Sequence, residues 1–346
     1  MRELAMTKER ELGLTGPVKA LAMLVIVLYH ACALYGGAWF GEPATPCSAL
    51  GLFVQWLSTI HVPLFLLVSG YIWAYLKMET DKYDDARVVL EKKARRLLVP
   101  YLFVSVVWAG PVYYFFYGPA STIEAFVLGD NPSQLWFLLA LYWMFALAEL
   151  MWRIRPGLLR KWQTLLASAA VAYVFARAAY ALPLDLFQVA RALDYFPCFL
   201  LGVCLRQADT SRFWRITPVA LLAVDVALFA AWFACNASGG GALGAASKVL
   251  LFVLRLVGPL ALLAVFGHAE RLIGKVRGSL FERHSFGVYL FHQQVDWILL
   301  SLINVSGAPP CGDSRGAVRR LPYRELGDQR CAQAVEGDGQ AALRRC

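Results

Sequence analysis

The sequence predicts an all-α fold, a polytopic bundle of membrane-spanning helices. Of its 346 residues, 59% are hydrophobic and only 16% are charged, whereas about 25% of the residues in a soluble domain are charged. A single soluble core could not bury so much apolar surface. This composition excludes a disordered chain, a fibrous repeat and an ordinary cytosolic enzyme.

The apolar runs are long enough to cross a bilayer, which takes about 20 residues per helix. We expect about nine spans, at 17–35, 50–76, 97–117, 134–152, 163–182, 190–205, 215–235, 247–267 and 285–305. No internal repeat or low-complexity linker separates them. The chain therefore divides into an N-terminal segment over 1–16, one membrane domain over 17–305 and a remainder over 306–346.

Basic residues are confined to alternate loops. Loops such as 77–96 and 268–284 are rich in Lys and Arg. Four other loops contain neither residue, namely 36–49, 118–133, 183–189 and 236–246. Because cytoplasmic loops are enriched in Lys and Arg, we expect a cytoplasmic N-terminus. The net charge of +9 then indicates basic cytoplasmic loops and no binding of nucleic acid.

Residues 306–346 depart from this pattern because they are polar and rich in arginine, with little apolar periodicity. Such a segment cannot offset its own ordering entropy, so we expect a poorly ordered tail. The eight cysteines form no C-x-x-C pair, and no histidine stands at zinc-ligand spacing from them. We therefore expect no metal site and no disulfide framework.

The first span carries two ionisable residues, which are costly inside a membrane and are functional candidates by default. Lys19 and His30 are eleven residues apart, so they share one helix face at an axial separation of about 16 Å. A cation near the cytoplasmic mouth and an imidazole deeper in the membrane suit an anionic substrate. Alternatively, Lys19 reaches the interface and His30 bonds a neighbouring helix.

Later spans add polar and aromatic candidates. Pro63 and Gly70 permit a kink and a close helix approach in the second span. Tyr289 and His292 share one face of the ninth span, and Trp136 at the end of the fourth also fits an aromatic belt.

Taken in order, these segments resemble the acyltransferase-3 family of integral membrane acyltransferases over about residues 15–305. Six motifs carry the resemblance: KALAMLVIVLYH (19–30), HVPLFLLVSGY (61–71), RRLLVPY (95–101), LWFL (135–138), YFPCFLLG (195–202) and SFGVYLFH (285–292). The family's first-span basic residue is most often Arg, where this chain has Lys19. Members usually have ten spans, one more than we find.

The resemblance implies an enzyme of the bacterial cytoplasmic membrane without a permanently bound cofactor. Its co-substrate is acyl-CoA, and it transfers an acyl group, best known as acetyl, to a hydroxyl of a cell-envelope glycan or a lipid-linked sugar. His30 is the expected general base or transient acyl carrier. Lys19, Arg95 and Arg96 would pair with the phosphates of CoA. The expected channel residues are His61, Ser69, Tyr71, Trp136, Tyr289 and His292.

Two points stay open at this stage, the carboxylate partner of His30 and the class of function. A carboxylate could orient His30, and Asp130, Glu149 and Asp194 are all candidates. A transporter or flippase-like carrier would also use intramembrane charges, here Arg177, Arg191, Asp225 and Arg255, although we see no inverted repeat. A non-catalytic relic of the family is the third alternative.

Overall fold

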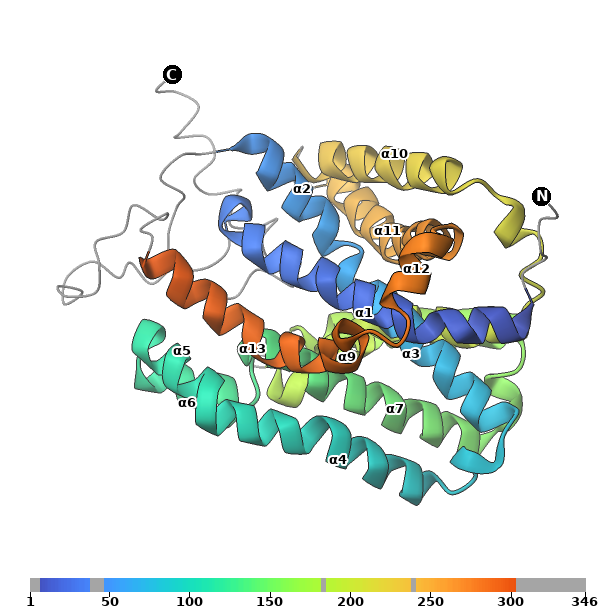
Figure 1. Cartoon of the computed structure of the whole chain (residues 1–346), viewed down its shortest axis with the longest axis horizontal. Helices are drawn as coiled ribbons and strands as arrows, with labels where there is room; N and C mark the ends of the chain where they lie inside the picture. Colours follow the sequence, from blue (N-terminus) through green and yellow to red (C-terminus); the bar gives the residue numbers. More distant parts are fainter. Residues whose placement is uncertain (1–6, 38–46, 182–184, 238–240, 303–346) are drawn as a thin grey trace.

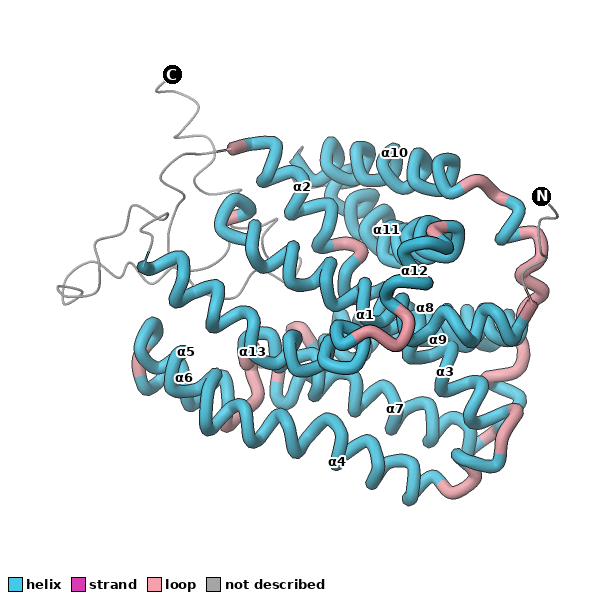
Figure 2. Tube along the Cα trace, viewed as in Figure 1, coloured by secondary structure: helices cyan, strands magenta, loops and turns pink. Residues whose placement is uncertain are grey.

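The computed structural model describes residues 7–37, 47–181, 185–237 and 241–302 (Figure 1). Within these ranges the chain is helical and contains no strand (Figure 2). The expected tail over 306–346 lies outside the described residues. The helices are α1 (Lys8–Cys32), α2 (Ser48–Ser58), α3 (His61–Met78), α4 (Ala86–Val104), α5 (Gly110–Tyr117), α6 (Pro119–Phe126), α7 (Trp136–Ile154), α8 (Trp162–Ala179), α9 (Val189–Gln207), α10 (Pro218–Ala237), α11 (Gly241–His268), α12 (Glu270–Val276) and α13 (Leu280–Leu302).

Seven helical segments among the described residues are long and apolar enough to cross a membrane. They are Lys8–Gly36, Ser48–Met78, Ala86–Tyr117, Ser133–Ile154, Leu186–Gln207, Pro218–Ala237 and Gly241–His268. The all-α membrane bundle is therefore confirmed, and seven of the nine expected spans meet this test. The expected spans at 163–182 and 285–305 are helices too, α8 and α13, but they are more polar. Polar side chains such as Gln294 and Asp296 of α13 and Arg177 of α8 account for the difference.

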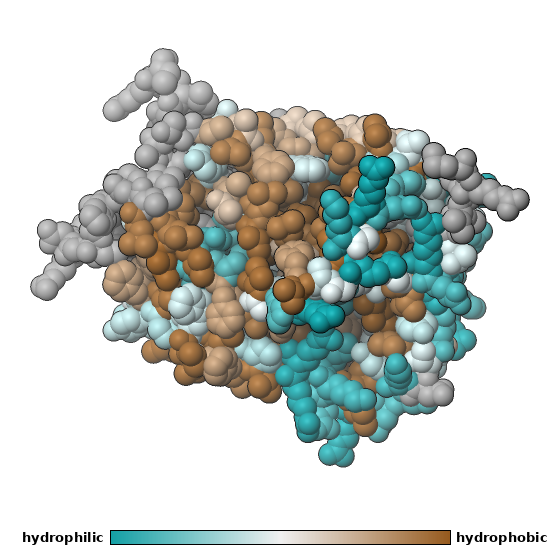
Figure 3. Space-filling view, viewed as in Figure 1, coloured by the Kyte–Doolittle hydropathy of each residue, from teal (hydrophilic) through white to brown (hydrophobic). Residues whose placement is uncertain are grey.

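The surface agrees with a membrane environment. Large apolar side chains such as Val106, Phe115 and Val219 are 74%, 66% and 76% exposed, which water would penalise and lipid does not. In Figure 3, hydrophilic residues gather toward the right-hand side, where α1 begins, and hydrophobic residues cover most of the remaining face. We call the side where α1 begins the Lys8 end and the opposite side the Cys32 end.

Helix α1 carries both Lys19 and His30 and lies inside the bundle. It packs against α3 and α13 (Figure 1). Thr7 caps it by accepting a hydrogen bond from the backbone N–H of Arg10 at 3.2 Å, so the helix begins well before the expected span at 17–35. The expected span at 50–76 is a broken helix, because α2 ends at Ser58 and α3 begins at His61.

Two prolines inside helices leave carbonyl groups that other residues satisfy. Proline lacks an N–H, so it cannot bond the carbonyl four residues earlier. Pro17 thereby releases the carbonyl of Gly13, which accepts from Arg277 at 3.1 Å. Pro259 releases the carbonyl of Arg255, which accepts from the thiol of Cys198 at 3.4 Å. Both prolines are therefore tolerated without an unpaired backbone carbonyl.

Helices α3 and α9 approach each other closely at two glycines. A Cβ atom at Gly70 would lie 2.0 Å from the carbonyl oxygen of Phe199, and one at Gly202 would lie 1.9 Å from that of Leu67. Small residues allow such close approach between membrane helices. This crossing fixes α3, and with it His61, against the rest of the bundle.

Candidate active site

Three histidines from distant parts of the sequence meet near the Cys32 end. The ring centroid of His30 on α1 lies 4.9 Å from that of His292 on α13 and 6.4 Å from that of His61 on α3. Nε2 of His292 is 3.0 Å from Nδ1 of His30. Tyr29 stacks on His61 at a centroid distance of 4.3 Å. The three expected histidines thus form one cluster.

A backbone carbonyl fixes the protonated nitrogen of each ring. Because a carbonyl oxygen only accepts, the Nδ1 atom that contacts it must carry the hydrogen, and Nε2 of the neutral ring carries the lone pair. The pairs are His30 with Ile26 at 3.0 Å, His61 with Leu57 at 2.7 Å and His292 with Tyr289 at 2.8 Å. In its neutral form, each of the three imidazoles therefore presents a lone pair at Nε2.

The expected channel residue Tyr289 supports the cluster from α13. It is buried, and its hydroxyl donates to the backbone carbonyl of Gln134. The side chain of Gln134 donates to the carbonyl of Leu290 at 2.8 Å and to Oε1 of Gln294 at 2.6 Å. These bonds join α13 to the turn that precedes α7. The glutamine pair was not expected, because both glutamines stand outside the recognised motifs.

A group of arginines lies beside the histidines. Asp194 accepts from Arg177 at 2.5 Å and from Arg255 at 2.7 Å, and the Asp194 side chain is 1% exposed. The guanidinium of Arg255 lies 4.4 Å from the ring centroid of Tyr195. Trp136, an expected channel residue, lies 5.7 Å from the same ring. The charge of Arg255 also acts on His61.

Each candidate carboxylate has partners away from Nδ1 of His30. Asp194 binds the two arginines described above. Glu149 accepts from Lys77 and Trp73, both at 2.8 Å. Asp130 accepts from the backbone N–H of Asp185 at 3.3 Å. The structure places His292 against Nδ1 of His30, where we expected a carboxylate.

Asp185 is an acidic group just before the span that starts at Leu186. Burial raises the pKa of Asp185 above its ordinary value, while hydrogen bonds from the backbone N–H groups of Ala190 and Arg191 act in the opposite direction. The carboxylate thereby caps the start of α9 and holds Arg191 near Trp136, whose ring centroid is 4.7 Å from the guanidinium carbon.

Nearer the Lys8 end, Lys19 lies among cationic and aromatic side chains. Its ammonium is 5.3 Å from the ring centroid of Phe65, and the charges of Lys93 and Arg96 act on it. Arg95 differs from the expectation that groups it with Lys19, because its side chain is 77% exposed and pairs with Glu91 at 2.6 Å. Lys93 was not among the expected site residues, although it stands in the same basic run.

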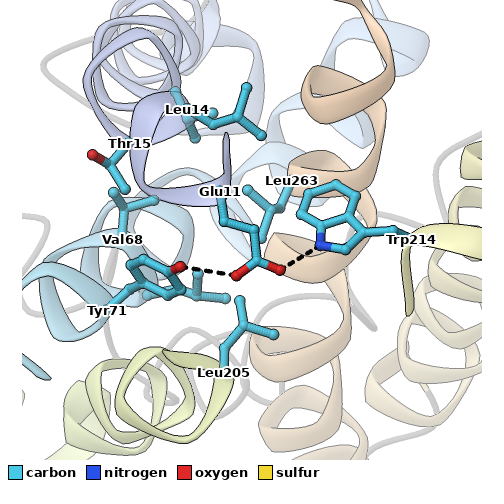
Figure 4. A pocket seen from close by; sticks show the side chains of 10 residues that line it. Glu11, Leu14, Thr15, Val68, Tyr71, Leu205, Trp214 and Leu263 are labelled. Atoms are coloured by element: carbon cyan, nitrogen blue, oxygen red, sulfur yellow. Dashed lines mark hydrogen bonds between the residues drawn. The ribbon is translucent and has the colours of Figure 1, made fainter. Parts of the chain in front are cut away.

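Tyr71 lies near the Lys8 end rather than beside the histidines, because it is ten residues after His61 on α3, about 15 Å along the axis. Its hydroxyl donates to Glu11 at 2.8 Å and accepts from Arg206 at 2.9 Å. Trp214 donates to the other carboxylate oxygen of Glu11 at 2.6 Å. Glu11, Tyr71 and Trp214 line a narrow, largely apolar pocket (Figure 4).

Arg206 also joins α9 to the loop after α3. Its guanidinium donates to both carboxylate oxygens of Glu79. These hydrogen bonds hold the pKa of Glu79 below its ordinary value. Ser69, another expected channel residue, is buried on α3 beside the Gly70 crossing. Tyr71 and Ser69 thus lie in helix packing at a distance from the histidine cluster.

The described residues contain no group of three or more His, Cys, Asp or Glu side chains that could hold a metal ion. In the histidine cluster, two of the rings contact each other edge on, with ring planes 61° apart. This arrangement supports a hydrogen bond between the two ring nitrogens.

The fold and the enclosed histidine cluster define an integral membrane protein with ionisable groups in its interior. A family model described as an acyltransferase domain matches residues 18–312. The chain therefore belongs to the acyltransferase-3 family, as its motifs indicate, and it is a membrane acyltransferase. No curated protein and no solved structure matches the chain.

Proposed function

We propose that the protein transfers an acyl group, in the first instance acetyl, from cytoplasmic acyl-CoA to a hydroxyl of a cell-envelope glycan or a lipid-linked sugar. One observation carries the proposal. A single helix, α1, bears Lys19 within a basic group and His30 within the histidine cluster, eleven residues further along. The two groups are about 16 Å apart along the helix axis.

The basic group suits the anionic part of the donor. Lys19, Lys93 and Arg96 offer three positive charges, and charge-assisted hydrogen bonds to phosphate are strong. Phe65 and Phe145 flank the two lysines, with ring centroids 5.3 Å from Lys19 and 3.9 Å from Lys93. A CoA molecule held there by its phosphates would extend its thioester along α1 toward His30.

His30 would supply the chemistry. Nε2 of its neutral ring accepts the proton of the acceptor hydroxyl as the oxygen attacks the thioester carbonyl. The new C–O bond forms, the C–S bond breaks, and the proton passes from His30 to the departing sulfur. The products are the acyl ester and CoA with a free thiol, so the reaction needs no further reactant.

The membrane orientation follows from the charges. We place the N-terminus and the Lys8 end in the cytoplasm of a bacterial cell, because the basic loops lie on that side and cytoplasmic loops are enriched in Lys and Arg. The donor then approaches the basic group from the cytoplasm. The histidine cluster lies nearer the opposite side, where an envelope acceptor would enter.

The intramembrane charges that a carrier would use have partners here. Arg177 and Arg255 pair with Asp194, and Asp225 accepts from Trp56 at 2.7 Å. These pairs fit a structural role in the bundle, so we propose acyl transfer alone.

The test combines an assay in vitro with one in cells. Proteoliposomes of the purified protein receive acetyl-CoA labelled in the acetyl group, with envelope glycan as acceptor, and mass spectrometry locates the label. We expect labelled ester on the glycan, and its loss from cells that lack the gene. Unchanged acetylation in the deletion strain, together with no labelled ester in vitro, would contradict the proposal.

A further inference from the structure

We propose that His292 is the positioning residue of His30, and that it holds the Nδ1–H of His30 through its own Nε2 lone pair. The inference rests on the acyl transfer proposed above. In this arrangement a second, neutral imidazole takes the place of the carboxylate that commonly orients a catalytic histidine.

Two backbone carbonyls determine which nitrogen donates. Nδ1 of His292 contacts the carbonyl of Tyr289 at 2.8 Å, so this nitrogen carries the hydrogen and Nε2 of the neutral ring accepts. Nδ1 of His30 contacts the carbonyl of Ile26 at 3.0 Å, so it also carries a hydrogen. Across the 3.0 Å gap between the rings, His30 therefore donates and His292 accepts.

The acceptor is held firmly on α13. His292 is 7% exposed, and Tyr289, one turn earlier, is anchored through its hydroxyl to the carbonyl of Gln134. Two residues on, at another face of α13, the amide groups of Gln134 and Gln294 exchange hydrogen bonds of 2.6 and 2.9 Å. Helix α13 is thus held in place both before and after His292, which keeps Nε2 of His292 directed at His30.

This contact matters most when the substrate proton reaches His30. The hydroxyl proton moves to Nε2 of His30, and the ring becomes an imidazolium that retains its Nδ1 hydrogen. Hydrogen bonds with an ionised donor are roughly twice as strong as neutral ones. The bond to His292 therefore strengthens as the charge develops, and the proton later leaves from Nε2 to the sulfur. His292 itself gains and loses no proton.

The alternative is that His292 only fills space between α1 and α13. Two substitutions separate the roles. His292→Gln places an amide oxygen near the position of Nε2 and keeps an acceptor for His30. His292→Met has a similar length and no comparable acceptor. A packing role predicts similar effects of the two substitutions, whereas a positioning role predicts that they differ.

The experiment measures acyl transfer by both variants in proteoliposomes, with folding checked by size-exclusion profile. We expect His292→Met to lower kcat by about ten- to a hundredfold, the range for a lost hydrogen bond to a charged group. The KM for acyl-CoA should stay unchanged, because His292 lies far from the basic group. His292→Gln should recover most of the lost kcat. Equal kcat values for His292→Gln and His292→Met, whether lowered or unchanged, would overturn the inference.

A second measurement does not depend on the activity of any variant. Nitrogen-15 NMR of the unmodified protein, with labelled histidines and with the signals of His292 assigned by their loss in His292→Gln, reports which nitrogen carries the hydrogen. We expect a protonated Nδ1 and a bare Nε2 on His292. A protonated Nε2 would overturn the positioning role, even if the protein transfers acyl groups. Absence of any transfer by the unmodified protein would instead contradict the proposed function.

Discussion

Nζ of Lys77 lies 2.8 Å from a carboxylate oxygen of Glu149, and both side chains are 2% exposed. The other oxygen of Glu149 accepts from the indole of Trp73 at 2.8 Å. The pair joins α3 to α7 inside the bundle. Removing one partner of such a buried ion pair leaves the other charge buried without compensation, which destabilises the fold.

Neutralising one partner should therefore destabilise the fold more than neutralising both. We expect Lys77→Met to lower the free energy of unfolding by about 3–5 kcal/mol, because it leaves Glu149 buried and unpaired with a cation. The double variant Lys77→Met/Glu149→Leu should lose much less. Unfolding in detergent compares both variants with the unmodified protein, and a double variant that loses as much stability as Lys77→Met, or more, would contradict this account.

The α3–α9 crossing predicts a contrast between two glycines. Gly70→Ala should destabilise the bundle by about 1–3 kcal/mol, the usual effect of overpacking, because the new Cβ would meet the carbonyl of Phe199 at 2.0 Å. Gly287→Ala on α13 is the matched control, since its Cβ would meet nothing within 4 Å. Thermal unfolding of both variants in detergent tests the contrast. Equal melting temperatures of the two variants would show that α3 and α9 can move apart to admit the extra methyl group without a loss of stability.

The basic group predicts which cations the donor needs. Lys19→Ala should raise the KM for acyl-CoA by about tenfold with a smaller change in kcat, because it removes a charge contact to phosphate and no reacting group. Lys93→Met should act in the same way, and Lys19→Arg should be tolerated. Arg95→Ala is the control, because Arg95 is exposed and pairs with Glu91. A larger rise in KM for Arg95→Ala than for Lys93→Met would refute this assignment.

The orientation can be tested with exposed positions on opposite sides. In a background in which all eight cysteines are replaced, Glu124→Cys should react with a membrane-impermeant maleimide in intact cells, and Asp84→Cys should react only after lysis. Both side chains are exposed in the structure. The expectation rests on two loops. The loop at 77–96 is rich in Lys and Arg, whereas the loop at 118–133 contains neither residue. The reverse labelling pattern would invert the topology.

Hydropathy predicts the helices well because a membrane span is a local property of about 20 residues. Mean hydropathy alone does not identify two of the helices as spans. α8 and α13 are predicted as spans from their apolar runs, yet they carry enough polar side chains to fall outside the seven most apolar segments. On α13, several of those polar groups are buried and bonded within the bundle, as with Gln294, so mean hydropathy underestimates how well the helix fits its place.

The contact between His30 and His292 could not be predicted from the sequence. Each residue's place on its own helix follows from its spacing, but the two are 262 positions apart, and only the packing of α1 against α13 brings their rings together. The basic run on α4 presents the same difficulty. It covers several faces of one helix, so the sequence does not reveal that Lys93 lies nearer Lys19 than the exposed Arg95.

The central claim is that His30 moves the proton in acyl transfer. The most direct measurement is the turnover of acyl-CoA in proteoliposomes by His30→Ala and His30→Gln, each shown by size-exclusion profile to be folded. We predict that both lower kcat by about a hundred- to ten-thousandfold, the usual effect of losing a positioned acid–base group, because an amide can bond a hydroxyl but cannot take its proton. Full turnover by a folded His30→Ala protein would contradict the account and leave His30 a structural residue.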